Sequence, residues 1–226
     1  DTSGKGNTFT ENNFETNDQL TDTPTNNKIT FNPLHNQQHG GVPQNGNLQY
    51  EGPGTRTMIG TTGGPFPTSG KWAVAIKAAQ VSTTVGWSYG LQQADDTDMG
   101  DAAGSNEDIG AGSNGTNMTP QSSDGYYYNY STSTATDPSL PLEADDEFWL
   151  AVDIGTGKYW FGIYDASASG YKWVATDGGL DGDPGAGSNE TGSLTGLQNN
   201  TGNFEFIFSS KQTNQNLYLQ READLS

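Results

Sequence analysis

The stretch DDEFWLAVDIGTGKYWFGIY, residues 145–164, predicts two adjacent strands that are joined by a glycine turn. Apolar side chains occupy one face of the first strand: Phe148, Leu150, Val152 and Ile154. Residues 149, 151 and 153 fall on the other face, and this period of two is typical of a β-strand. Gly155 and Gly157 supply the turn, and an aromatic second strand follows. No set of catalytic residues accompanies these strands, so we expect a scaffold with a binding or structural role.

Other segments show the same alternation, and their sequences are SGKWAVAIKAAQ from Ser69, VGWSYGL from Val85, GYYYNY from Gly125 and NFEFIF from Asn203. A hairpin between the first two is the simplest connection. Hydrophobicity nearly vanishes over residues 92–125, which predicts a long loop. The fold class that we predict is all-β, an antiparallel two-sheet β-sandwich with long polar loops.

The length and composition of the chain limit its domain organisation and its partners. A chain of 226 residues suits one main domain, and we place an extended N-terminal linker or arm at residues 1–34 and the sandwich domain at residues 35–226. The formal net charge of −18 leaves no basic stripe for nucleic acid. The sequence contains no run of about 18 apolar residues, so we expect no membrane insertion. Cysteine is absent, which excludes disulfides and thiolate sites.

Short motifs spread along the chain carry a family resemblance, and they are TDTPTNN at Thr21, NPL at Asn32, GNL at Gly46, SGKW at Ser69, LAVDIGTGKYWF at Leu150, GDPGAGSN at Gly182 and LTGL at Leu194. Together they resemble the SPRY-like, concanavalin-type modules of tailed-phage virion proteins. The resemblance covers roughly residues 1–210, and the chain departs from the family pattern in the acidic insert 95–124 and in the segment 161–173. The motifs are structural, so no catalytic residue is carried over.

The resemblance implies a sandwich displayed on the outside of a virus particle, in a tail fibre, a spike or a capsid decoration. The function that we expect is a non-enzymatic virion surface protein that attaches to host cell-surface polysaccharide. Its other partners would be virion proteins and further copies of itself, with a trimer as one arrangement. A purely structural decoration or cement protein is the alternative, because sandwiches of this type serve both roles.

Aromatic side chains at loop edges are our candidates for stacking on sugar rings, because they combine an apolar face with a polar tip. The candidates are Trp87, Tyr126, Tyr128, Tyr130 and Trp173. The competing interpretation is that most aromatic residues pack inside, since alternation directs about half of the tyrosine-rich strand to the core.

Acidic residues suggest two further hypotheses. Glu143, Asp145 and Glu147 have the ExDxE spacing of concanavalin-like glucanases, but an acidic turn before a buried strand explains them better. The loops DDTDMGD and DGDPGAGSNE offer oxygen ligands for a structural Ca²⁺, and the candidate ligands are Asp95, Asp98, Asp181 and Asp183. We expect no other cofactor. The two histidines, His35 and His39, are assigned to a loop, not to a metal pair.

Overall fold

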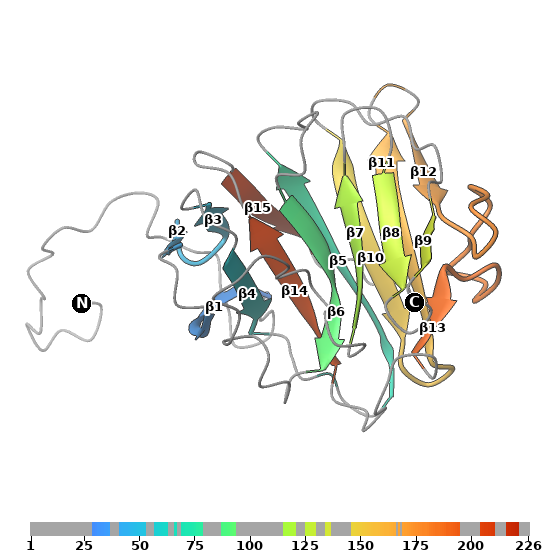
Figure 1. Ribbon diagram of the computed structural model, residues 1–226, viewed down its shortest axis with the longest axis horizontal. Coiled ribbons are helices and arrows are strands. Elements are labelled where there is room, and N and C mark those ends of the chain that lie inside the picture. Colours follow the sequence, from blue (N-terminus) through green and yellow to red (C-terminus); the bar gives the residue numbers. More distant parts are fainter. Residues whose placement is uncertain are drawn as a thin grey trace, which may run out of the picture.

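The computed structural model describes residues 29–36, 41–52, 57–62, 66, 69–78, 87–93, 115–120, 125–129, 134–136, 146–165, 167, 169–194, 204–210 and 216–221. These residues form two β-sheets that pack face to face, and all paired strands are antiparallel (Figure 1). The predicted antiparallel β-sandwich is therefore confirmed. The described part of the chain contains no helix that is long and apolar enough to cross a membrane.

The seven-stranded sheet has the order β1-β4-β14-β6-β7-β8-β9. Its strands are β1 (Phe31–Asn36), β4 (Thr57–Thr61), β14 (Phe204–Ser210), β6 (Trp87–Gln93), β7 (Gly115–Pro120), β8 (Gly125–Asn129) and β9 (Thr134–Thr136). The edge strand β1 pairs with β4 through an irregular register, and Pro33 lies within it. The predicted domain boundary after residue 34 falls inside β1, and the division into arm and sandwich stays a prediction.

The eight-stranded sheet has the order β12-β11-β10-β5-β15-β3-β2, with β13 paired to β11. Its strands are β12 (Gly170–Trp173), β11 (Lys158–Asp165), β10 (Glu147–Asp153), β5 (Lys71–Ala78), β15 (Asn216–Arg221), β3 (Gln49–Glu51), β2 (Pro43–Gln44) and β13 (Gly192–Ser193). The edge strand β2 contains Pro43.

The predicted hairpin of β10 and β11 is present, with seven registered pairs from Glu147↔Tyr164 to Asp153↔Lys158. Asp153 Oδ1 accepts a hydrogen bond from the Thr156 backbone N–H at 3.1 Å, and Gly157 adopts φ +69° in the turn. Positive φ is the conformation that glycine supplies without steric cost.

The hairpin predicted between the strands now labelled β5 and β6 is wrong. β5 pairs with β10 and β15 in the eight-stranded sheet, whereas β6 pairs with β14 and β7 in the seven-stranded sheet. Alternation identified both strands, but they lie in different sheets, and alternation alone carries no information on which strands pair.

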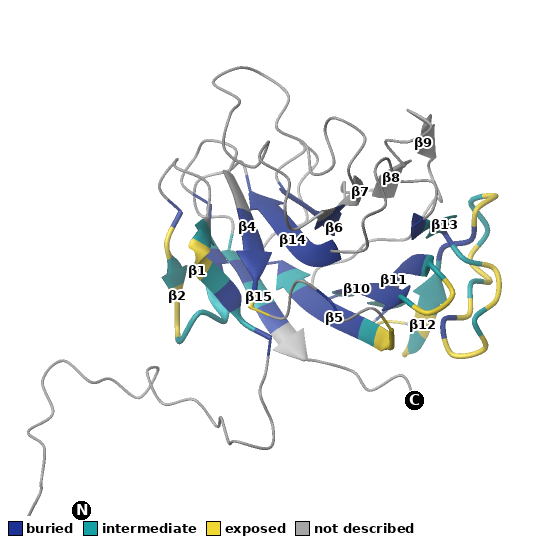
Figure 2. Ribbon diagram, turned by 90° about the horizontal axis from the view of Figure 1, so that it is seen from below, coloured by how far each residue is buried: buried dark blue, intermediate teal, exposed yellow. Residues whose placement is uncertain are grey.

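The main core lies between the two sheets, where apolar side chains of both inner faces meet. Figure 2 shows the buried residues, in dark blue, along strands of both sheets. Tyr89 of β6 contacts Phe161 of β11 with ring centroids 5.4 Å apart, and Trp87 contacts Phe148 of β10 at 4.8 Å. Each of these four side chains is at most 2% exposed. Full burial of such a side chain contributes roughly 1.5–3 kcal/mol, so this layer provides the main stabilisation of the sandwich.

Candidate functional site

A loop of residues 174–191 connects β12 to β13, and both of its ends are anchored on β11. The Val174 backbone N–H donates to the Phe161 carbonyl at 2.8 Å, and the Thr191 N–H donates to the Tyr159 carbonyl at 3.0 Å. The buried Thr191 hydroxyl donates to the Val174 carbonyl and accepts the Phe161 N–H at 3.0 Å. One threonine thus ties the beginning of the loop to its end.

Side chains of β11 also hold the middle of this loop. Trp160 Nε1 donates to the Ser188 carbonyl at 3.0 Å, and Lys158 Nζ donates to the Gly187 carbonyl at 3.0 Å. Asp183 and Ser188 exchange two backbone hydrogen bonds of 3.0 Å, and the Asp183 carboxylate accepts the Ala186 N–H at 2.9 Å. The loop therefore has a defined shape although half of its residues are exposed.

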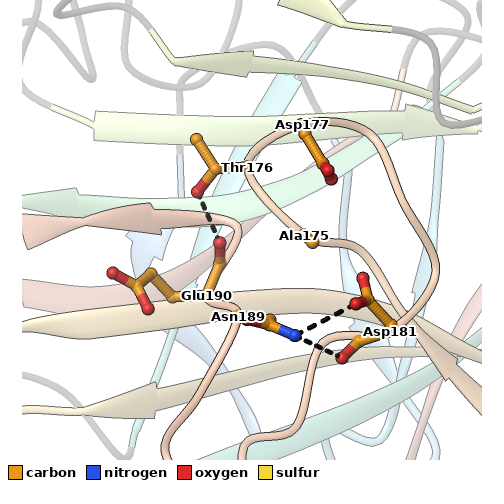
Figure 3. A pocket seen from close by; sticks show the side chains of 6 residues that line it. All are labelled: Ala175, Thr176, Asp177, Asp181, Asn189 and Glu190. Carbon is orange, nitrogen blue, oxygen red and sulfur yellow. Dashed lines mark hydrogen bonds between the residues drawn. The ribbon is translucent and has the colours of Figure 1, made fainter.

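The loop encloses an open pocket of about 370 Å³, which we take as the candidate functional site (Figure 3). Its lining residues come from both ends and the middle of the loop, and they are Ala175, Thr176, Asp177, Asp181, Asn189 and Glu190. Asn189 Nδ2 donates to Asp181 Oδ2 at 3.0 Å, and the Thr176 hydroxyl donates to the Glu190 carbonyl at 2.6 Å. Amide, hydroxyl and carboxylate groups thus lie together at one surface.

The pocket is negatively charged. Hydrogen bonding from its own backbone N–H, and then from Lys158, lowers the pKa of Glu190 below its ordinary value of 4.5. Lys158 Nζ lies 3.1 Å from Glu190 Oε2 and forms an ion pair with this carboxylate. Carboxylate oxygens only accept hydrogen bonds when ionised, so the pocket favours ligands that carry hydroxyl or ammonium donors.

The carboxylates of the pocket do not converge on one point. Figure 3 shows the Glu190 carboxylate directed away from Asp181. Within the described residues no group of three or more His, Asp or Glu side chains is placed to hold a metal ion. The candidate Ca²⁺ ligands Asp181 and Asp183 lie in this loop, and both accept hydrogen bonds from the loop itself. Asp95 and Asp98 lie outside the described residues, and the Ca²⁺ site stays a prediction.

The predicted sugar-binding aromatics are distributed over separate regions. Trp173 is the last residue of β12 and directly precedes the pocket loop. Tyr126 and Tyr128 belong to β8, where Tyr128 pairs with Asn117 and Tyr126 with Thr119, and Tyr130 lies outside the described residues. Trp87 requires a correction: it is 2% exposed and packs against Tyr89 and Phe148, so its indole ring offers no free face to a sugar.

Three aromatic residues that we did not predict as binding residues lie beside Trp173. We use the name aromatic platform for Trp149, Tyr164, Tyr171 and Trp173. Tyr171 contacts each of the other three, with ring centroids 5.6 Å from Trp149, 5.0 Å from Tyr164 and 6.2 Å from Trp173. The signal in the sequence was GYKW, in which Tyr171 and Trp173 are two residues apart and so share one face of a strand.

The remaining sequence candidates take structural positions. Glu147 begins β10 and pairs with Tyr164 and Lys77, while Glu143 and Asp145 lie outside the described residues. His35 lies in β1 with its Nδ1 2.9 Å from Glu205 Oε1 of β14, and His39 lies outside the described part of the chain. A hydrogen bond with Glu205 raises the pKa of His35 above 6.5, although partial burial opposes this shift.

Comparison with known proteins supports the fold. No protein-family model and no curated protein matches the chain. The structure is similar to that of the TRIM65 PSpry domain, with a TM-score of 0.60 and 12% identity over 86% of this chain and 90% of that one. It is also similar to lectin II from Ulex europaeus, with a TM-score of 0.51 and 9% identity over 87% of this chain and 92% of that one. The chain therefore has a fold that SPRY domains and legume lectins share.

Proposed function

We propose that this chain is a non-enzymatic carbohydrate-binding sandwich on the surface of a virus particle, where it attaches to host cell-surface polysaccharide. The observation that carries the proposal is the open pocket beside the aromatic platform. Sugars present hydroxyl donors along their edges and C–H groups on their ring faces, and polar side chains next to aromatic rings match both.

The lectin fold supports this assignment of ligand class. A lectin from Ulex europaeus with a similar structure, at a TM-score of 0.51 and 9% identity, is known in a complex with galactose. The sandwich therefore belongs to a fold that can present a sugar site, although fold alone does not select a ligand.

The virion setting is supported by the motifs that resemble SPRY-like modules of tailed-phage virion proteins. In that setting the chain lies outside the cell, in a tail fibre, a spike or a capsid decoration. Its protein partners are other virion proteins and further copies of itself, with a trimer as one arrangement. A net charge of −18 argues against nucleic acid as a ligand.

Replacing one pocket carboxylate tests the proposed function. Asp181→Asn keeps the size of the side chain but removes a charged acceptor from the pocket, and we expect an affinity for bound glycan that is about tenfold lower. Asp183→Asn is the matched control: it makes the same charge change in the same loop, at a residue that does not line the pocket. Affinity is measured by calorimetry with glycans that an array of bacterial surface polysaccharides identifies.

Three results would contradict the proposal: that the wild-type chain binds no glycan on the array, that both variants bind as well as the wild type, or that the chain releases reducing sugar from a polysaccharide. The third result would favour a glycoside hydrolase, and loss of that activity in Glu147→Gln would then implicate the acidic residues at the start of β10.

A further inference from the structure

We propose that the aromatic platform is the surface on which a pyranose ring stacks, so that the glycan runs from the platform into the pocket, and that the ligand is a neutral or amino-sugar chain, not an anionic one. This inference rests on the proposed function and specifies its ligand.

The platform lies on the outer face of the eight-stranded sheet, away from the main core. In the register of β10, β11 and β12, Trp149 pairs with Gly162 and Gly162 pairs with Trp173, which places both tryptophans on one face. Phe161 and Ile163 alternate with Gly162 and belong to the core between the sheets. Trp149 and Trp160 form a separate outer cluster with Ala73, Ala75 and Ala151, against which Tyr164 and Trp173 pack.

Gly162 allows Trp173 to lie close against the sheet. A Cβ atom at this position would approach Trp173 Cε3 to 2.5 Å and Cδ2 to 2.8 Å, both shorter than any normal contact. The indole ring therefore occupies the space that a side chain on β11 would need. A glycine inside a strand often marks such a close approach, and here it leaves room for the indole ring.

Tyr171 is the accessible part of the platform. Its residue is 56% exposed, whereas Trp149 beneath it is 3% exposed. The rings of Tyr171 and Trp173 are nearly parallel, at an interplanar angle of 14°, while Trp149 and Tyr164 contact Tyr171 edge-on. A large ring that is exposed and already ordered by three neighbours loses little conformational entropy when a ligand covers it.

The platform and the pocket are continuous along the backbone. The Gly182 N–H donates to the Trp173 carbonyl at 3.0 Å, and Asp181 forms a parallel bridge with Trp173. Asp181 lines the pocket, so one wall of the pocket is attached to β12, the strand that carries Tyr171 and Trp173. We therefore assign both parts to one glycan of two or more sugar units.

Charge selects the class of sugar. The pocket contains the carboxylates of Asp177, Asp181 and Glu190, and the whole chain carries a formal charge of −18. A uronic acid or a sialic acid would place a further negative charge against these groups, which costs free energy at short range. Sugar hydroxyl groups and the ammonium group of an amino sugar would instead donate to them.

The test compares Tyr171→Ala with Tyr218→Ala, a matched control. Tyr218 of β15 pairs with Lys77 of β5 and lies several strands away from Tyr171 in the same sheet. The probes are cellohexaose, chitohexaose, a chitosan hexamer and hexagalacturonate, together with the best glycan of the array. We expect Tyr171→Ala to bind about tenfold more weakly, and Tyr171→Phe and Tyr218→Ala to bind like the wild type. We also expect hexagalacturonate to bind at least about tenfold more weakly than the best neutral or cationic hexamer.

The outcomes separate this inference from the proposed function. If the wild type binds a glycan, Asp181→Asn weakens the binding and Tyr171→Ala does not, the pocket binds sugar without the platform and the inference is wrong. If hexagalacturonate binds as tightly as the neutral hexamers, the assigned ligand class is wrong. If Tyr171→Ala instead lowers the molecular mass in sedimentation velocity without changing affinity, this face joins copies of the chain. If the wild type binds no glycan at all, the proposed function is wrong, and the inference that rests on it is wrong as well.

Discussion

The two faces of the β10–β11 hairpin are both apolar, but they are used differently. The inner face carries Phe148 and Phe161, which pack against the rings of β6 in the opposite sheet. The outer face carries Trp149 and Tyr164, which pack against Tyr171 of the neighbouring edge strand β12. The inner rings are fully enclosed, whereas the outer cluster ends in a ring that is largely exposed. Apolar character alone therefore does not distinguish residues that stabilise the sandwich from residues that are available for binding.

The largest expected effect comes from removing an inner ring. Phe161 is fully buried and contacts Tyr89 and Tyr159, so Phe161→Ala should leave a cavity and lower the free energy of unfolding by about 3–5 kcal/mol. Tyr171→Ala on the outer face should cost less than about 1 kcal/mol, because its ring is exposed. Urea denaturation measures both, and equal losses would break the distinction between the faces.

Filling the space beside Trp173 tests how closely the outer cluster is packed. Gly162→Ala would place a methyl group 2.8 Å from the Lys172 backbone oxygen as well as against the indole ring, and should cost up to about 3 kcal/mol. Gly155→Ala is the control, because its Cβ would come no closer than 3.3 Å to the flexible Asp153 carboxylate. Urea denaturation and near-UV circular dichroism of the tryptophans follow the change. An unaltered spectrum together with unaltered stability would contradict the packing described for Trp173.

Substitution of Thr191 tests the hydrogen bonds that link strand β11 to the pocket loop. Thr191→Val removes the hydroxyl that bonds to both Val174 and Phe161, and should cost about 1–2 kcal/mol because two buried backbone groups lose their partner. Thr191→Ser keeps the hydroxyl and should retain most of the stability. Hydrogen exchange should show faster exchange in residues 174–191 of the valine variant. Equal protection in both variants would mean that other contacts alone order the loop.

The seven-stranded sheet contains a polar pair, His35 and Glu205, and we expect the smallest change in stability when this pair is broken. Strand β14 directs Phe206 to the core, and the buried Glu205 at the preceding position contacts His35. Because the pKa of His35 is raised in the folded state, its contribution is complete below the unfolded pKa of about 6.5 and is lost as the pH rises through the higher folded value. We expect His35→Gln to lose up to about 1 kcal/mol at about pH 5.5 and almost nothing at about pH 8.5.

Denaturation at the two pH values measures this difference, and an NMR titration of the His35 ring gives the folded pKa directly. A folded pKa at or below 6.5, or a loss of stability in His35→Gln that is the same at both pH values, would contradict the assignment of the pair.

Local patterns in the sequence predicted local structure correctly. The alternation over residues 148–154 and the glycines of the turn identified the β10–β11 hairpin, because both signals lie within a few residues of each other. The predicted pairing of β5 with β6 is wrong, since β5 pairs with β10 and β15 whereas β6 pairs with β14 and β7 in the other sheet. Strand identity is a local property, whereas strand partners depend on the whole sheet.

The candidate site shows the same limit. Trp173 and Trp87 both lie in alternating segments, and spacing does not tell whether a given face is directed to the core or to the outside. The platform escaped prediction because Trp149, Tyr164 and Tyr171 come from three strands that only the register of the sheet brings together. The pocket loop was recognisable as polar, but the role of Thr191 depends on contacts with Phe161, thirty residues away.

The edge strands β1 and β2, at the left of Figure 1, each contain a proline, Pro33 and Pro43. Proline has no backbone N–H, so neither strand can offer an unbroken row of donors to a strand from another molecule. Where many copies are crowded at high local concentration, this limits strand-to-strand pairing at these two edges. At β1 and β2, contacts between copies are then left mainly to side chains, which can be matched to one neighbour.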